Sequence, residues 1–364
     1  MVDMDLYQKI SILGPSAQYD TCGPKDFATT TNIPGVYHAK LAGNRVCRLF
    51  KVLQTNLCIN NCRYCAFRSG RSCTRTTATA DEMAKAFDSA YSRRLVDGFF
   101  LSSGIQKNAD YTMSRLLDTA VILRKKYQYR GYLHLKIMPG SSDSCVANAL
   151  RLANRVSLNI ESPTESTLAE LSPDKDLKKG FYNTLNKIKK QLRRLKLAGQ
   201  RTPSLTTQFV IGAGQETDAQ VIRATFHLYQ NFGLSRVFYS AFRPVSQTPL
   251  EHKPAESLTR EHRLYQSDFL MRFYKFKPWQ IPLDANGRLL TDVDPKMAWA
   301  KLNPQVFPIN LNKARFYDLL KIPGLGPTGA QKIIKVRGKT KINSLDKLKN
   351  QRLQLEKIKK FVCF

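Results

Sequence analysis

Residues 49–73, LFKVLQTNLCINNCRYCAFRSGRSC, join a strand-like run to a cluster of cysteines. The run over 49–57 has the apolar content of a buried β-strand. Cys58, Cys62 and Cys65 follow it at once in a C-x3-C-x2-C spacing. Eight cysteines in 364 residues are too few for a disulfide scaffold, and clustered thiolates select soft ions. The stretch therefore predicts a zinc or iron–sulfur centre in the loop after a strand.

Five more strand-like runs follow and alternate with segments of helical period. They cover residues 98–103, 132–138, 155–161, 205–212 and 236–242. Strands separated by helices predict βαβ units and a parallel sheet, hence an α/β fold. Six strands are fewer than a closed eight-stranded barrel needs, so an open partial barrel and a doubly wound sheet both remain possible. In either fold the site lies at the carboxyl ends of the strands.

The length of the chain predicts more than one domain. We expect an N-terminal extension over 1–48 that begins with a short amphipathic helix, and a core of strands and helices over 49–243. A Pro- and charge-rich linker with a helical region covers 244–305. A small all-α unit over 306–364 closes the chain.

Charge is the second strong feature of the composition. Lys and Arg number 58 against 28 Asp and Glu, which gives a net charge of +30. Such a field attracts polyanions, with nucleic acid the leading candidate and an anionic membrane surface a poorer one. A basic proteome with solvated basic faces is the alternative reading. No apolar run approaches the roughly 18 residues of a membrane span, and the start lacks the features of a signal peptide, so we expect a cytoplasmic protein.

Three cysteines in one tight loop suit a particular kind of centre. A [4Fe–4S] cluster ordinarily takes four cysteine ligands, so three would leave one iron with an open coordination site. An open site on a metal is typical of catalysis. The alternative is a closed structural site in which Cys73 is the fourth ligand, of a cluster or of zinc, although zinc sites usually have two separated cysteine pairs. Whether Cys22, Cys47 or Cys145 binds a second metal stays open.

The cysteine loop resembles a known signature. C-x3-C-x-aromatic-C after the first strand is the signature of radical S-adenosylmethionine (radical SAM) enzymes, and Tyr64 fills the aromatic position. The resemblance implies a partial (β/α)6 TIM-like barrel, a [4Fe–4S] cluster and S-adenosyl-L-methionine as cofactors, and release of a 5′-deoxyadenosyl radical. It also implies an electron donor such as flavodoxin or ferredoxin.

Two further strand ends fit this resemblance on the methionine side of the cofactor. Ser102, Ser103 and Gly104 stand where the superfamily has its glycine-rich motif for the methionine amine. Small residues there let backbone carbonyls reach the ligand. Lys136, near the end of the third strand, is a candidate partner of the methionine carboxylate, although a lone lysine at a strand end is more often a surface residue.

The fourth and fifth strand ends supply the remaining candidates. Asn159 and Glu161 alternate to one face, where ribose or substrate could bind, although a lone Glu there is also more often on the surface. Ile211 and Gly212 resemble the superfamily's adenine-side motif. The joint placement of candidates at four successive strand ends favours a cofactor site.

Residues 318–337, DLLKIPGLGPTGAQKIIKVR, resemble a helix-hairpin-helix. Its glycines turn backbone N–H groups outward, and at the start of a helix those groups bind phosphate. The candidate DNA-binding residues are Lys321, Gly324, Leu325, Gly326, Lys332 and Lys335. Phosphate contacts of this kind fix position on a duplex without reading sequence. The alternative is a plain helical hairpin used for packing.

The two motifs together resemble the DNA modification/repair radical SAM proteins, whose genes tend to neighbour a uracil-DNA-glycosylase-like partner. This implies duplex DNA, and a protein of that kind, as partners. The basic helix predicted over 183–199 either extends a nucleic-acid track or is a solvated face. Two other functions stay open: a radical SAM enzyme acting on RNA or on a protein partner, and a non-catalytic iron–sulfur DNA-binding protein.

Overall fold

The computed structural model describes residues 4–20, 33–40 and 46–364. Its contacts divide the chain into two compact units. The first unit comprises Met1–Glu216 and His227–Glu256, and the second comprises Thr217–Phe226 and Ser257–Phe364.

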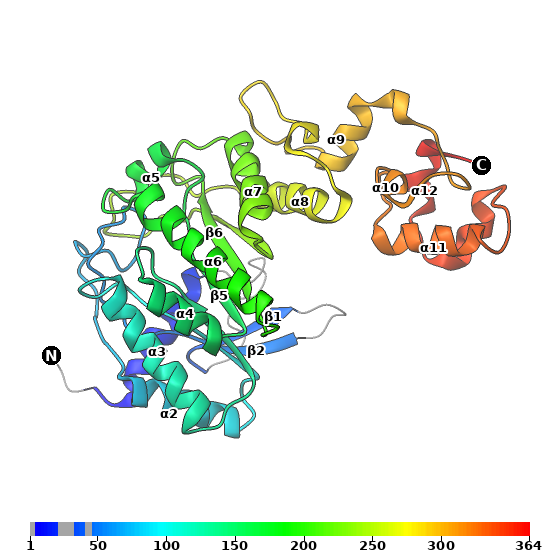
Figure 1. Cartoon of the computed structure of the whole chain (residues 1–364). Helices are drawn as coiled ribbons and strands as arrows, with labels where there is room; N and C mark the ends of the chain where they lie inside the picture. The colour runs from blue at the N-terminus through cyan, green and yellow to red at the C-terminus, as the bar shows by residue number, and fades with distance from the viewer. Residues whose placement is uncertain (1–3, 21–32, 41–45) are drawn as a thin grey trace. The chain divides into compact units, whose positions relative to one another are not determined.

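A seven-stranded sheet organises the first unit (Figure 1). Its strands are β1 (Val36–Lys40), β2 (Val46–Leu53), β3 (Gly98–Ser102), β4 (Tyr132–Lys136), β5 (Arg155–Ser157), β6 (Ser204–Ile211) and β7 (Arg236–Ala241). Strands β2 to β7 are parallel, and β1 pairs antiparallel with β2 at the edge. The α/β class and the six predicted parallel strands are confirmed.

The strand order distinguishes a partial barrel from a doubly wound sheet. Neighbours in the sheet follow the order of the sequence from β1 to β7, with no reversal. Because βαβ crossovers are right-handed, an unreversed order places all the crossover helices on one face. A doubly wound sheet reverses its order and carries helices on both faces. The sheet is thus of the open, partial-barrel kind, and its opposite face is free to line a site.

One layer of helices covers the outer face. It includes α2 (Ala80–Ser92), α3 (Ala109–Lys125), α4 (Asp143–Leu152) and α6 (Asn183–Leu197), each in contact with the next (Figure 1). Shorter helices are α1 (Leu6–Ser16), η1 (Ala17–Tyr19), α5 (Glu165–Leu171) and the π-helix η3 (Leu177–Tyr182). Helix α2 begins with a capping box, in which Thr79 accepts from the Glu82 N–H and Glu82 accepts in return from the Thr79 N–H.

Two strand boundaries differ from the sequence prediction. Strand β2 begins at Val46 instead of 49, and β1 is a strand that the pattern does not predict, within the segment 1–48. Strand β5 ends at Ser157, whereas the run predicts a strand to 161. The Thr207 hydroxyl of β6 interrupts the hydrogen-bond ladder between β5 and β6. It accepts from the Ile160 N–H at 3.1 Å and donates to the Leu158 carbonyl at 2.6 Å.

The second unit contains helices and a minimal sheet. After the first part of α7 (Asp218–Phe232) come α8 (Leu258–Tyr274), α9 (Pro295–Leu302), α10 (Phe316–Leu319), α11 (Pro327–Arg337), η6 (Leu345–Gln351) and α12 (Leu355–Ile358). Strands β8 (Ile309–Asn310) and β9 (Val362–Cys363) pair in parallel, so the prediction of an all-α unit over 306–364 is wrong in this detail. An apolar cluster that includes Leu320 and Ile333 forms its core.

In the part of the chain that the structure describes, no helix is both long and apolar enough to cross a membrane.

Candidate cysteine-loop site

The cysteine loop leaves the end of β2, and four of its carbonyl oxygens accept hydrogen bonds from a single guanidinium. Arg75 donates to the carbonyl oxygens of Asn56 and Phe67 through Nη1, and to those of Arg68 and Arg71 through Nη2, at 2.6–3.0 Å. A loop outside helix and sheet must satisfy its carbonyls in some other way. Arg75 does so for four of them and fixes the course of the loop.

The three predicted cluster ligands lie in this loop. Cys62 is buried, while Cys58 and Cys65 are partly exposed. Burial and the neighbouring Cys62 thiol raise the pKa of the Cys65 thiol to about 12. The protein alone therefore disfavours the thiolate of Cys65, and a bound cationic centre would reverse that preference. A metal centre bound by these three thiols would therefore have to bring its own positive charge.

The other cysteines are placed differently. The Cys73 Sγ lies 3.9 Å from the carbonyl oxygen of Ala66, Cys47 is in β2, and Cys145 is in the first turn of α4. Cys22 lies outside the described residues. Among residues 4–20, 33–40 and 46–364, no three Cys, His, Asp or Glu side chains converge to hold a single metal ion. A cubane cluster needs a wider arrangement, because each thiolate binds a different iron.

The end of β3 is hydrogen-bonded to the cysteine loop. The Gly104 N–H donates to the Thr55 carbonyl at 2.8 Å, and the Ile59 N–H donates to the Ile105 carbonyl at 2.8 Å. A Cβ on Gly104 would stand 2.2 Å from the carbonyl oxygen of Leu57, the residue before Cys58. Glycine is therefore required at 104 by a backbone contact, which differs from the ligand contact inferred from the sequence.

A cavity of about 950 Å³ opens beside the loop. Cys58 and Cys65 are on its wall, together with Tyr64. Residues two apart, in the second halves of five strands or just after them, also line the wall: Lys51 and Leu53, Ser102 and Gly104, Lys136 and Met138, Asn159 and Glu161, and Gln208 and Val210. Arg236 and Ser240 of β7 line it as well. This is the lumen face of the partial barrel, and it carries charged and amide side chains among apolar ones.

Most of the predicted cofactor residues meet in this cavity. Its wall includes Tyr64, Ser102, Ser103, Gly104, Lys136, Asn159 and Glu161. Ile211 and Gly212 are not among the lining residues. Ile211 is fully buried, and Gly212, at a φ of +83°, donates its N–H to Glu216 at 2.6 Å. A left-handed backbone of this kind favours glycine.

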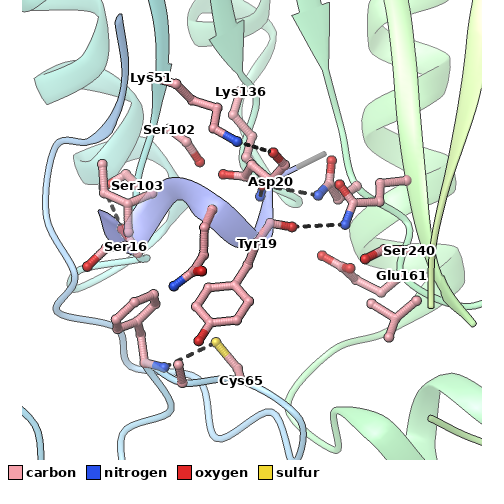
Figure 2. Close-up of a pocket in the computed structure, with 18 of the residues that line it drawn as sticks. Ser16, Tyr19, Asp20, Lys51, Cys65, Ser102, Ser103, Lys136, Glu161 and Ser240 are labelled. Atoms are coloured by element: carbon pink, nitrogen blue, oxygen red, sulfur yellow. Dashed lines mark hydrogen bonds and ion pairs between the residues drawn. The ribbon is translucent and has the colours of Figure 1, made fainter. Parts of the chain in front are cut away.

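The N-terminal segment enters the cavity at its centre, where Figure 2 shows Tyr19 and Asp20. The Lys136 Nζ lies 2.5 Å from an Asp20 carboxylate oxygen, and Asn159 donates to the same oxygen at 3.4 Å. Lys51 donates to the Asp20 carbonyl at 2.7 Å. Lys136, the predicted partner of the methionine carboxylate, is thus paired with a carboxylate of the chain itself.

Both members of this pair are charged. Burial by itself would raise the pKa of Asp20, but Lys136 outweighs burial and the net direction is down. Burial would likewise lower the pKa of Lys136, but Asp20 and Glu161 bring the net direction up. An ionised pair therefore spans from the N-terminal segment to the end of β4.

A second charged pair stands nearer the cysteines. Glu161, at a φ of +69°, lies 4.0 Å from the Lys175 Nζ, and burial raises the pKa of its carboxyl. Burial would lower the pKa of Lys175, but the net direction is up. The largest opposing effect comes from the thiol of Cys62, followed by Glu161 and the other two cysteines. Burial and the adjacent Glu161 also raise the pKa of the Tyr64 hydroxyl. Lys175 is thus a cation beside the cysteine loop, with a side chain that is 13% exposed.

Several site residues have no signal in the sequence pattern. Asp20, Lys51, Ser172 and Lys175 are such residues, and so is Arg75 within an Arg-rich run. Ser172 and Lys175 follow α5, more than a hundred positions after the cysteines, and only the fold brings them together. A largely buried lysine in the cavity wall is conspicuous only once its surroundings are known.

The turn between α10 and α11 holds the predicted DNA-binding residues. Gly324 has a φ of +80° and is exposed, while Leu325 is buried. A Cβ at Gly326 would meet only the Tyr274 hydroxyl, at an ordinary 3.4 Å. Two of the flanking lysines are engaged: Lys321 pairs with Asp318 at 3.0 Å, and Lys332 donates to the Gln351 carbonyl at 2.6 Å. Lys335 is exposed on α11.

Comparison with known proteins identifies similar solved structures. No protein-family model and no curated protein matches the chain. Radical SAM proteins are among the structures it resembles. The FeFe-hydrogenase maturase HydG from Carboxydothermus hydrogenoformans is 19% identical, over 60% of this chain and 50% of that one, with a TM-score of 0.47.

Two other structures overlap to a similar degree. Methylornithine synthase (PylB) is 15% identical over 60% of each chain, with a TM-score of 0.49. A radical SAM methyltransferase from Sphaerobacter thermophilus is 14% identical over 67% of this chain and 74% of its own, with a TM-score of 0.45. The chain thus spans about half of HydG and three fifths of PylB.

The Asp20–Lys136 pair gives a prediction about stability. Asp20→Asn should lower the free energy of unfolding by about 3–5 kcal/mol, because Lys136 keeps a buried charge without its partner. Asp20→Asn combined with Lys136→Met should recover part of this loss. Urea unfolding measures both. Asp97→Asn, at the exposed pair with Arg48, is the matched control and should cost less. Equal losses at the two sites would contradict a buried ionic pair.

The same pair predicts how stability depends on pH. Because the folded pKa of Asp20 lies below its unfolded value, the pair stabilises the fold above about pH 4. That contribution is lost as the pH falls through the lower, folded pKa. Asp20→Asn should therefore flatten the acid limb of a stability–pH curve, and an unchanged limb would contradict the assignment.

Proposed function

We propose that this protein is a radical SAM enzyme that acts on DNA. Its [4Fe–4S] cluster is bound by Cys58, Cys62 and Cys65, and S-adenosyl-L-methionine occupies the adjoining cavity. The observation that carries the proposal is a C-x3-C-x-Tyr-C loop, fixed after β2, that opens on a cavity of about 950 Å³ at the strand ends. Parallel α/β sheets place their chemistry at that edge.

The cluster would supply the electron that cleaves the cofactor's sulfonium to give a 5′-deoxyadenosyl radical. The chain's own residues have positioning roles. Arg75 and Gly104 fix the loop, while Tyr64 and Glu161 line the cavity beside it. The surrounding strand ends would limit the access of bulk water to a bound cofactor, which protects a reactive species from side reactions.

Anaerobic reduction with dithionite in the presence of S-adenosyl-L-methionine tests the enzyme class. We expect a reconstituted protein with four irons and four sulfides per chain to release 5′-deoxyadenosine and methionine. Retention of iron without any cleavage of the cofactor would favour the non-catalytic alternative.

Two features support DNA as the substrate. The net charge of +30 favours encounter with a polyanion. The α10–α11 turn presents an exposed glycine, Gly324, at a φ of +80°, and the following helix α11 carries the exposed Lys335, as a helix-hairpin-helix would. The proposal includes duplex DNA bound without regard to sequence, an electron donor such as flavodoxin or ferredoxin, a uracil-DNA-glycosylase-like partner and a cytoplasmic location.

Binding to duplex DNA should depend on phosphate contacts. Affinity should fall steeply with salt and hardly vary with sequence, and Lys335→Gln should reduce the slope of log affinity against log salt by about one. Gly326→Val should weaken binding uniformly, because its side chain would cover an N–H at the start of α11. Fluorescence anisotropy over a salt series measures these effects.

Glycine positions in the same unit supply the control. Gly338→Ala makes only ordinary contacts at 3.5 Å and should leave both fold and affinity unchanged. Gly324 is unsuitable as a probe, because a side chain there is strained at a φ of +80° and meets Lys357. Equal affinity of Gly326→Val, Lys335→Gln and the parent would place the DNA surface elsewhere on the protein.

A further inference from the structure

The three cysteine sulfurs each have one hydrogen-bonding partner within the described part of the chain. The Ile105 N–H donates to the Cys58 Sγ and the Phe67 N–H donates to the Cys65 Sγ, both at 3.4 Å. The third contact is shorter and of a different kind: the Ser172 Oγ lies 2.9 Å from the Cys62 Sγ. Two of the partners are backbone groups, and only the Ser172 hydroxyl comes from a side chain.

The direction of the Ser172 contact follows from the state of the sulfur. Either atom can donate while Cys62 is a thiol. An iron-bound Cys62 is a thiolate with no proton, so Ser172 must then donate and the sulfur must accept. The hydroxyl is fully buried, and Cys62 is 5% exposed, so water does not compete for the bond.

The segment that carries Ser172 is fixed against the cysteine loop at two other points. The Arg63 N–H donates to the Leu171 carbonyl at 2.8 Å, and the Asn61 N–H donates to the Asp174 carboxylate at 2.6 Å. These bonds flank Cys62 on the loop and Ser172 on the segment. The hydroxyl is therefore held in place by its backbone, independently of the sulfur.

We propose that Ser172 is a positioning residue that sets the reduction potential of the cluster through its hydrogen bond to the Cys62 sulfur. The inference rests on the proposed function, since it needs the cluster. One-electron reduction by the donor adds negative charge that the ligand sulfurs share. A donated hydrogen bond stabilises this more negative state, and hydrogen bonds to cluster sulfurs are among the factors that set such potentials. Ser172 thus makes the electron easier to accept.

Ser172→Ala is the direct test, because no other side-chain bond of the described residues depends on this hydroxyl. We expect the variant to keep its iron and sulfide. The ratio of reduced to oxidised cluster at a fixed potential should fall about tenfold, which is about 59 mV for one electron. An electrochemical titration followed by electron paramagnetic resonance measures the shift. Ser172→Thr keeps the hydroxyl, so the midpoint reduction potential of its cluster should be close to that of the parent.

Ser141→Ala is the matched control. Ser141 is also fully buried, but its hydroxyl donates to the Met138 carbonyl and not to a sulfur. The midpoint reduction potential of the cluster in Ser141→Ala should equal that of the parent. A spectroscopic readout is independent of the potential. The coupling of the Ser172 hydroxyl proton to the reduced cluster should be present in the parent and in Ser172→Thr and be lost in Ser172→Ala, while all three proteins keep the couplings of the Ile105 and Phe67 N–H protons.

Two outcomes would overturn the inference. Equal midpoints in the parent, Ser172→Ala and Ser141→Ala would show that the bond does not tune the cluster. Loss of the cluster from Ser172→Ala alone would make Ser172 a structural residue instead. Failure of the proposed function is a separate result, because the parent protein would then assemble no cluster or cleave no S-adenosyl-L-methionine.

Discussion

Alanine at Cys58, Cys62 or Cys65 should abolish both the brown colour of the reconstituted protein and the release of 5′-deoxyadenosine. Each of these sulfurs is expected to hold a separate iron, so the loss of any one leaves a cluster with two thiolates and two open irons. Iron and sulfide per chain, with product quantified after anaerobic reduction, measure the effect. Circular dichroism should show an intact fold, because each change removes a single sulfur atom.

Cys73→Ala is the control for this series. Cys73 lies in the same loop, but its sulfur is directed to the Ala66 carbonyl. The variant should keep the cluster and nearly all of the activity. Loss of the cluster from Cys73→Ala would instead support a closed site with four ligands, and with it the structural reading of the loop.

The sequence pattern predicts the sheet because its strands are buried on at least one face. Runs such as 98–103 and 205–212 are apolar enough to be recognised, and the structure has β3 and β6 there. Edge strand β1 is only five residues long and half polar, so its pairing with β2 gives no such signal. Strand β5 is shortened by one side chain, that of Thr207, which belongs to the neighbouring strand. A pattern within one segment cannot anticipate a bond from another.

The candidate site likewise contains residues that local sequence identifies and residues that only the tertiary fold brings in. The cysteine spacing is local, so the sequence alone identifies it. The strand-end candidates at 102–104, 136, 159 and 161 also follow from local position, and all line the cavity. Asp20 and Lys175 reach the cavity by tertiary folding, each from a segment that has no relation in sequence to the cysteines. The charge balance of the cavity, with two partly buried lysines each facing a carboxylate, could therefore not be predicted.

Gly104→Val should eliminate the cluster although residue 104 is not a ligand. A Cβ at this position would lie 2.2 Å from the Leu57 carbonyl oxygen and 3.2 Å from the Cβ of Cys58. Neither backbone can yield without moving the loop, because Gly104 donates to Thr55 and Ile59 donates to Ile105 on either side of the contact. Displacement of Cys58 by an ångström or more should prevent it from reaching its iron. We expect iron per chain to fall to the level of Cys58→Ala.

The comparison with Gly180→Ala separates this effect from the general cost of replacing a glycine. A Cβ at Gly180 would meet only a Pro139 carbon at 3.7 Å, an ordinary contact. Gly104→Ala already adds the offending atom, so it should lose most of the cluster, while Gly180→Ala keeps it. Full iron content in Gly104→Ala together with weak cofactor binding would favour the ligand-facing role that the sequence suggests. Full iron content with normal binding would show that the close approach to Leu57 relaxes at no cost, and that the loop is not positioned by β3.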